Sequence, residues 1–245
     1  LVFYGIIPLC LFFHAEYSIK RILSKGIIAL LTFPFIRLFR KVTKGDINLR
    51  EYHLIESPLF DSTTEIDQLS LILHSFWFYF SKLIFPTEFV SYYGYNTIQF
   101  NGYSAASIFT ILIITGFIVL GLFALKRKTP ISFGILLFLG GMIPIVNWLV
   151  PLVGIVAERF VTLASIGWVI FIVFSFKFLH EKSKLASGKI ILNSIFILYI
   201  IASFLMIQTR NQEWKNQFEL FTADVKKEPE SATLHALVGK EYITK

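Results

Sequence analysis

Long apolar runs limit this chain more than any other feature. Six stretches carry few or no charged side chains and approach the roughly 20 residues that a helix needs to cross a bilayer. They lie at about 1–14, 24–39, 105–125, 131–150, 160–179 and 189–207. With 55% hydrophobic residues and 27 Phe in 245, the composition is far from that of a soluble domain. The sequence predicts an all-α integral membrane protein, a bundle of about six spanning helices.

The charged residues between these runs predict an orientation. The short linkers "KRKTP" (126–130) and "HEKSKLASGK" (180–189) are basic, and basic loops stay on the cytoplasmic side of a membrane. The linker "PLVGIVAER", the region just before 105 and everything after 207 then face outward. The net charge of +7 is explained by this topology, so we expect no nucleic-acid partner.

A seventh apolar run, 69–85, has two interpretations. Its polar residues fall within one arc of a helix, which indicates a helix in the membrane interface anchored by Trp77 and Tyr79. The excess of basic residues at 37–50 over those at 20–25 favours a spanning helix instead. The pattern alone leaves both open.

The chain changes character after residue 207, where it becomes polar and charged. Pro229 and Ser231 predict a helix start, and apolar residues then recur at helical spacing. The spacing of Leu237, Gly239 and Tyr242 matches the first helix of a tetratricopeptide repeat, although a generic amphipathic helix fits as well. The predicted domains are a membrane domain at 1–207, with an external loop at 40–104, and the start of a repeat region at 208–245.

Glu158 and Arg159 are adjacent charges between two apolar runs. They could mark the water boundary of the next helix, with their long side chains reaching out of the membrane. They could also belong to a binding site, because Pro144, Asn147 and Pro151 break the preceding helix. Irregular backbone at membrane depth occurs only where it is buried in protein or lines a water-filled cavity. The planar guanidinium of arginine suits phosphate.

Few other residues point to chemistry. Tyr93 belongs to a tyrosine-rich segment, 86–103, that suits either a membrane interface or a sugar-binding surface. The carboxylates between 56 and 88 show no spacing that selects a catalytic pair, and Cys10 is the single cysteine. No metal-ligand motif, phosphate loop or nucleophile elbow is present. We expect no certain cofactor, with a divalent metal as an open possibility.

The ordered pieces resemble a known family. The stretch "IPIVNWLVPLVGIVAERFVTLASIGW" (143–168) is similar to a conserved stretch of the membrane O-mannosyltransferases with tetratricopeptide repeats, members of the GT-C superfamily. The matching residues are Pro144, Asn147, Pro151, Gly154, Val156, Ala157, Glu158, Arg159, Leu163, Ser165 and Gly167. Thr162 and Ala164 stand where the family often has Tyr and Pro. "ESPL" (56–59), "LIFPTEFVSYYGYNTI" (83–98) and the passage after 207 resemble further segments, with Tyr92 at a position that is often acidic.

The resemblance implies an inverting glycosyltransferase. A sugar would pass from a polyprenyl phosphate to a protein or glycan hydroxyl on the outer face, with 69–85 on the membrane surface. Arg159, Glu158, Asn147 and Tyr93 would bind the substrate or the lipid phosphate. Among them, Arg159 would contact the phosphate, and Glu158 would orient Arg159 or touch the acceptor. The acidic catalytic base of that superfamily lies early in the membrane domain, and we expect this chain, which begins at Leu1, to be an internal part of a longer protein that lacks it.

The competing functions are a transporter or flippase of lipid-linked sugars and a membrane-anchored repeat scaffold. The expected partners are the lipid donor, the acceptor, membrane lipids and, for the repeat region, a protein. The composition favours a multi-pass protein of a bacterial inner membrane over one of the endoplasmic reticulum, with the repeats in the periplasm.

Overall fold

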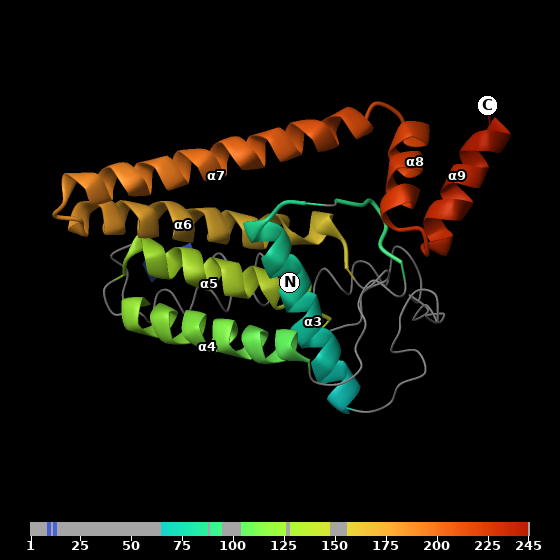
Figure 1. The fold of residues 1–245 in the computed structure, drawn as a ribbon. Coiled ribbons are helices and arrows are strands. Elements are labelled where there is room, and N and C mark those ends of the chain that lie inside the picture. The colour runs from blue at the N-terminus through green and yellow to red at the C-terminus, as the bar shows by residue number, and fades with distance from the viewer. Residues whose placement is uncertain are drawn as a thin grey trace.

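The computed structural model describes residues 9–10, 12–13, 65–87, 89–94, 104–125, 128–147 and 156–244, and within them all regular structure is helical (Figure 1). The elements are α3 (Glu65–Ile84), α4 (Ala105–Leu125), α5 (Pro130–Met142), the 3-10 helix η1 (Glu158–Val161), α6 (Thr162–Lys182), α7 (Ala186–Glu213), α8 (Gln217–Lys227) and α9 (Ala232–Thr244). The all-α prediction is confirmed for this part of the chain. The spans predicted at 1–14 and 24–39 lie outside it, apart from residues 9–10 and 12–13, which are helical.

Two of the described helices are long and apolar enough to cross a membrane. They are Glu158–Lys182, which joins η1 to α6, and α7; the stretch Ser107–Phe123 of α4 and the whole of α5 are shorter apolar helices. None of the apolar window of α7 is buried within the protein, so its hydrocarbon surface faces outward. These features support a membrane protein. The finer prediction of a six-span bundle stays a prediction.

The α5 helix is shorter than the predicted span of 131–150. It begins with Thr129 as N-cap, whose hydroxyl accepts from the Ser132 N–H, and ends at Met142, followed by turns over 143–147. Pro144 has no N–H to continue the helical ladder. Asn147 then takes a left-handed φ of 61°, a conformation that Asn tolerates better than most residues. The chain therefore leaves the helix direction early, as the break at Pro144 and Asn147 suggested.

Glycines bring α5 and α6 unusually close together. A Cβ added at Gly134 would lie 2.6 Å from the Phe171 backbone nitrogen, and one added at Gly167 would lie 2.3 Å from that of Phe138. Small residues at helix crossings allow backbones to approach in this way in membrane proteins. The α5–α6 pair is the most extensive helix contact in the described part of the chain.

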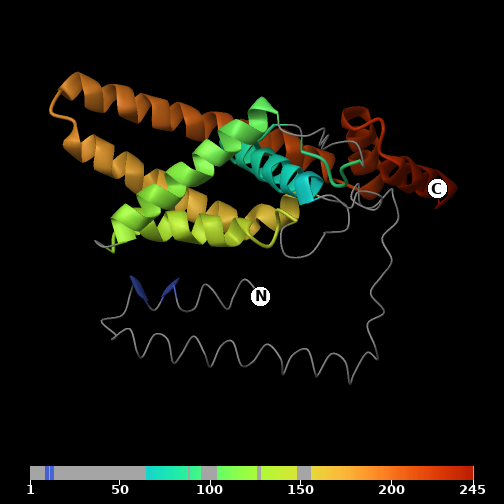
Figure 2. The same ribbon diagram turned by 90° about the horizontal axis from the view of Figure 1, so that it is seen from below.

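Aromatic side chains fill the core beside this pair. Phe80 of α3 packs edge-on against Phe117 of α4 and Trp168 of α6, with ring centroids 6.1 and 5.4 Å away. Phe138 of α5 lies 5.7 Å from Trp168. Figure 1 shows α3 inclined to the side-by-side α4, α5 and α6, and Figure 2 shows α6 and α7 diverging from their shared turn.

The polar arc of α3 turns into the protein. Ser70 and Ser75 are fully buried, and Ser75 accepts a hydrogen bond from the Asn147 amide at 3.3 Å. His74 bonds to Ser104, just before α4, at 3.0 Å. Several polar groups that indicated an amphipathic surface helix are thus used in packing. The 20-residue α3 is not among the described helices apolar enough to span.

Successive helices run in alternating directions, so several chain segments meet at one end of the bundle. We call this the η1 end; it comprises the start of α4, residues 143–147, η1 and residues 214–216. The α8–α9 pair lies at the same end (Figure 1). The turn between α6 and α7, at 183–185, and the start of α5 lie at the opposite end (Figure 1). The α7 helix continues past the predicted end at 207 to Glu213, because "IQTRNQE" still favours a helix after the apolar part stops.

Candidate functional site

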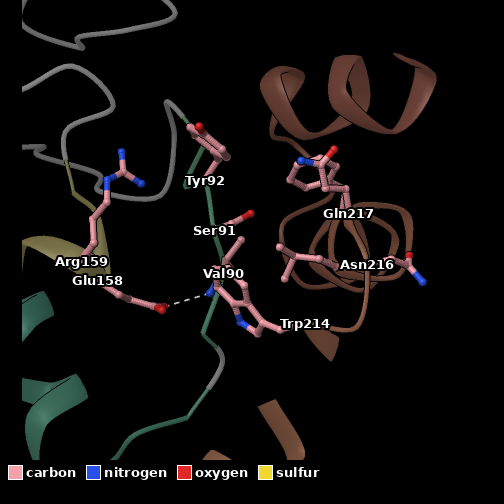
Figure 3. A pocket seen from close by; sticks show the side chains of 10 residues that line it. Val90, Ser91, Tyr92, Glu158, Arg159, Trp214, Asn216 and Gln217 are labelled. Atoms are coloured by element: carbon pink, nitrogen blue, oxygen red, sulfur yellow. Dashed lines mark hydrogen bonds between the residues drawn. The ribbon is translucent and has the colours of Figure 1, made fainter. Parts of the chain in front are cut away.

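A pocket of about 420 Å³ opens at the η1 end, between residues 90–92, η1 and the connection from α7 to α8. Its walls are Val90, Ser91, Tyr92, Glu158, Arg159, Trp214, Asn216, Gln217, Leu220 and Phe221 (Figure 3). The volume falls in the range of about 300–1,000 Å³ that is usual for small-molecule sites. The pocket therefore joins the two residues singled out in the sequence to a wall that lies more than fifty positions later.

Glu158 binds residues 90–93, a segment that precedes α4 in the chain. Its Oε1 accepts a hydrogen bond from the Val90 N–H at 2.8 Å and a second, short one from the Tyr93 hydroxyl. Burial, together with the charge of Glu158, raises the pKa of Tyr93, so its hydroxyl stays protonated and keeps donating. This carboxylate has a structural task, which is to hold residues 90–93 against η1.

Arg159 has a different environment from its neighbour. Its side chain is exposed, and its guanidinium lies 5.6 Å from the Tyr92 ring centroid and 5.0 Å from that of Phe160. No ion pair of Arg159 is found among the described residues. The aromatic rings stabilise the cation and limit its directions. Its N–H donors are therefore available to an anion in the pocket.

A second carboxylate holds the same segment from the opposite side. Asp224 of α8 is fully buried, and its Oδ2 accepts from the Ser91 N–H at 2.7 Å and the Ser91 hydroxyl at 2.6 Å. Arg210 of α7 donates to both of its oxygens, at 2.7 and 3.4 Å. Residues 90–93 are thus held between Glu158 on η1 and Asp224 on α8.

The network extends to the end of α8. Arg210 also pairs with Glu213, whose two carboxylate oxygens accept hydrogen bonds from the Lys227 ammonium at 2.8 and 2.6 Å. Lys227 donates a further, longer bond of 3.3 Å to the Phe89 carbonyl. Buried polar networks that are well satisfied fix a single arrangement of the segments they join. This one fixes how α8 sits on the pocket.

The far wall of the pocket combines aromatic and amide side chains. Trp214 follows α7 directly and remains 59% exposed. Asn216 is the N-cap of α8, its side chain bonded to the Glu219 N–H at 2.8 Å, and in Figure 3 it points away from the pocket. The Gln217 amide faces the side of Tyr92 in the same view.

The four residues predicted to bind the substrate or the lipid phosphate do not lie together in the structure. Glu158 and Arg159 line the pocket. Tyr93 is buried behind Glu158, and Asn147 is buried against Ser75, so neither borders the pocket. Tyr95 and Tyr103 of the tyrosine-rich segment lie outside the described residues.

Sequence reasoning missed the pocket residues that follow α7, together with Ser91 and Asp224. Arg210 and Glu213 stand at the i, i+3 spacing of a helical ion pair, which was a readable signal. Nothing in the sequence connects Asp224 to Ser91, because their contact depends on where α8 returns. A divalent metal was left as an open possibility by the sequence, and the described ranges hold no group of three candidate ligands for one.

Comparisons of the chain with protein-family models, with curated proteins and with solved structures find no match. The resemblance to the GT-C superfamily therefore rests on the sequence motifs alone.

Proposed function

We propose that the protein acts as a membrane glycosyltransferase of the GT-C type, using a polyprenyl-phosphate sugar as donor and a protein or glycan hydroxyl as acceptor. The observation that carries the proposal is the Arg159 guanidinium, unpaired in the described part of the chain and directed to a pocket at the end of two long apolar helices. A lipid-linked donor needs both parts, because its phosphate lies where the bilayer meets water and its chain lies in hydrocarbon.

An apolar pocket supports the lipid half of this proposal. It has a volume of about 240 Å³ and lies between α6 and α7, with Trp168, Phe176 and Phe196 among its walls. The Tyr199 hydroxyl of α7, which also lines this pocket, donates to the Leu83 carbonyl of α3 at 3.0 Å and joins α7 to α3 there. A hydrocarbon chain that leaves the bilayer beside α7 would find apolar contact in this pocket.

In the reaction, the acceptor oxygen attacks the anomeric carbon while the bond from that carbon to the phosphate oxygen breaks. The lipid phosphate leaves with the electron pair, and the configuration at carbon is inverted. The acceptor proton goes to an acidic base, which we assign to no residue of this chain. Arg159 stabilises the charge that grows on the leaving phosphate, and the loss of one such donor typically lowers the rate by about 10²–10³.

The orientation follows from the same proposal. The basic linkers face the cytoplasm and the η1 end faces outward, which is the periplasm of a bacterial inner membrane. The α8–α9 pair then begins an external tetratricopeptide-like region that binds a protein, with α3 lying at the membrane surface.

The test is sugar transfer by the full-length protein in membranes, with a labelled polyprenyl-phosphate sugar. Arg159→Ala is expected to lower transfer by about 10²–10³, and Arg159→Lys, which keeps the charge but loses the fork of donors, by less. The matched control is Lys226→Ala, which removes an exposed cation of α8 that does not border the pocket. Expression and thermal unfolding are measured for each variant.

The outcomes separate the competing functions. Equal transfer by Arg159→Ala and the control would return Arg159 to a membrane-boundary role. Movement of the intact lipid-linked sugar across the membrane without release of polyprenyl phosphate would identify a flippase. Neither activity in the wild type would favour the scaffold.

A further inference from the structure

Trp214 is placed beyond the position of a membrane-boundary tryptophan. The apolar part of α7 ends at Ile207, and the helix continues through "QTRNQE" before Trp214. At 1.5 Å per residue, the seven steps from Ile207 to Trp214 put Trp214 about 10 Å past the last apolar residue. A tryptophan that anchors a helix in the interface would stand at the end of the apolar part. Anchoring in the interface therefore does not explain the exposed ring of Trp214, whereas binding of a ligand in the pocket that it lines does.

The ring is held in place from inside the protein. The Arg210 guanidinium lies 5.7 Å from its centroid, and Arg210 is itself fixed by Asp224 and Glu213. The backbone N–H of Trp214 donates to the Asn211 carbonyl at 3.2 Å. An aromatic surface that is already ordered loses little conformational entropy when a ligand packs on it.

Two uncharged polar side chains share the pocket with this ring. Gln217 and Tyr92 are exposed, and neither side chain has a hydrogen-bond partner among the described residues. In Figure 3 they stand on opposite sides of the opening, with Arg159 beyond Tyr92. An amide offers both donors and an acceptor, and a phenol offers one of each.

Aromatic rings with uncharged donors and acceptors suit a sugar. The C–H face of a pyranose is apolar and packs on a ring, while its hydroxyls need partners that both donate and accept. We propose that Trp214, Gln217 and Tyr92 form the subsite for the sugar of the donor, next to the phosphate contact at Arg159. This rests on the proposed function and specifies which part of the donor meets which wall.

The test is a binding measurement on the full-length protein in nanodiscs, with two pairs of probes. Each pair compares polyprenyl phosphate with the same lipid carrying one mannose or one glucose. The wild type is expected to bind at least one sugar-bearing lipid about tenfold more tightly than the bare phosphate, which corresponds to about 1.4 kcal/mol. Arg159→Ala should weaken binding of both members of a pair.

Trp214→Ala and Gln217→Ala should remove the preference for the sugar and leave binding of the bare phosphate within twofold. Trp214→Phe, which keeps an aromatic ring, should retain most of the preference and guards against misfolding of the alanine variant. Tyr242→Ala is the control, since it removes a ring of α9 that is 65% exposed and does not border the pocket.

The subsite would be overturned if Trp214→Ala and Gln217→Ala weakened the binding of the sugar-bearing and the bare lipid equally, or weakened neither. A wild type that binds sugar-bearing and bare lipids equally would also overturn it while leaving the phosphate contact standing. In the sugar-transfer assay, a Trp214→Ala variant that raises only the KM for the acceptor would place the acceptor in this subsite and refute the assignment to the donor. Sugar-selective binding that depends on Trp214 but yields no transfer would sustain the subsite and reject the glycosyltransferase.

Discussion

Asp224 is the residue whose loss should most disturb the pocket without touching a ligand. It is fully buried and joins three segments, because it accepts from Ser91 before α4 and from Arg210 on α7 while it belongs to α8. Asp224→Asn keeps the shape of the side chain but removes the charge and turns an amide N–H₂ toward a donor. We expect residues 89–92 and α8 to separate more often in this variant.

The magnitude follows from these contacts. Removing one partner of a buried ion pair costs about 3–5 kcal/mol when the other charge stays buried. Here Glu213 still pairs with Arg210, which places the expected loss at the lower end, about 3 kcal/mol. Ser91→Ala deletes only the hydroxyl donor and leaves the Ser91 N–H bonded, so we expect about 1.5 kcal/mol, as for a hydrogen bond to a charged group.

The assay is hydrogen exchange of peptides covering residues 89–94 and 217–227 in the full-length protein. The Ser91 N–H is itself a donor to Asp224, so it reports the opening directly. A loss of about 3 kcal/mol corresponds to exchange on the order of 100-fold faster, and 1.5 kcal/mol to about tenfold, up to the limit that the wild-type protection sets. Lys226→Gln, an exposed change on the same helix at a side chain without a contact among the described residues, is the control and should leave exchange unchanged.

Two results would refute the reasoning. Exchange at residues 89–94 in Asp224→Asn within threefold of the control would mean that the buried network does not hold this segment. Faster exchange throughout α4–α7, with no local maximum at 89–94 and α8, would mean that Asp224 supports the whole fold instead of this junction.

Two further predictions concern the bundle and the loop. Gly167→Ala would place a Cβ 2.3 Å from the Phe138 nitrogen and should lower the free energy of unfolding in detergent by about 1–3 kcal/mol. The control is Gly116→Ala on α4, which has open space around it and should be neutral or slightly stabilising. Equal effects of the two changes would contradict the close α5–α6 contact. Because the pKa of Tyr93 is raised above its ordinary value of 10.0 in the folded protein, its contribution to stability is complete below that pH and is lost as the pH rises through the folded value. The wild type should therefore lose stability above about pH 10 more steeply than Tyr93→Phe, which lacks the titrating group, and parallel profiles of unfolding temperature against pH would refute this.

The sequence by itself determined the helical class and the main apolar helices. A single run of about 20 apolar residues satisfies its own backbone groups in hydrocarbon as a helix, so α4, α6 and α7 follow from composition and length. Pro144 and Asn147 indicated a break after α5, because an interior helix position needs the N–H that proline lacks, although the predicted span ran on to 150. Pro229 and Ser231 likewise marked the start of α9. These are local effects, and they need no knowledge of distant residues.

Only the tertiary structure decided what the adjacent charges do. From the sequence, Glu158 and Arg159 were an adjacent pair that either marked the water boundary or served a binding site together. In the fold, Glu158 turns to Val90 and Tyr93, while Arg159 turns to the pocket. The difference arises because residues 90–93 pass beside η1, an arrangement that no spacing along the chain encodes.

The same reason explains the far wall of the pocket and the inward polar face of α3. Trp214 and Gln217 reach the pocket because α7 returns antiparallel to α6 and α8 folds back onto residues 89–92. The polar arc of α3 predicted a water-exposed side, yet Ser75 meets Asn147 inside the protein. Local pattern records that a side chain is polar, whereas the tertiary packing of distant segments decides whether its partner is water or protein.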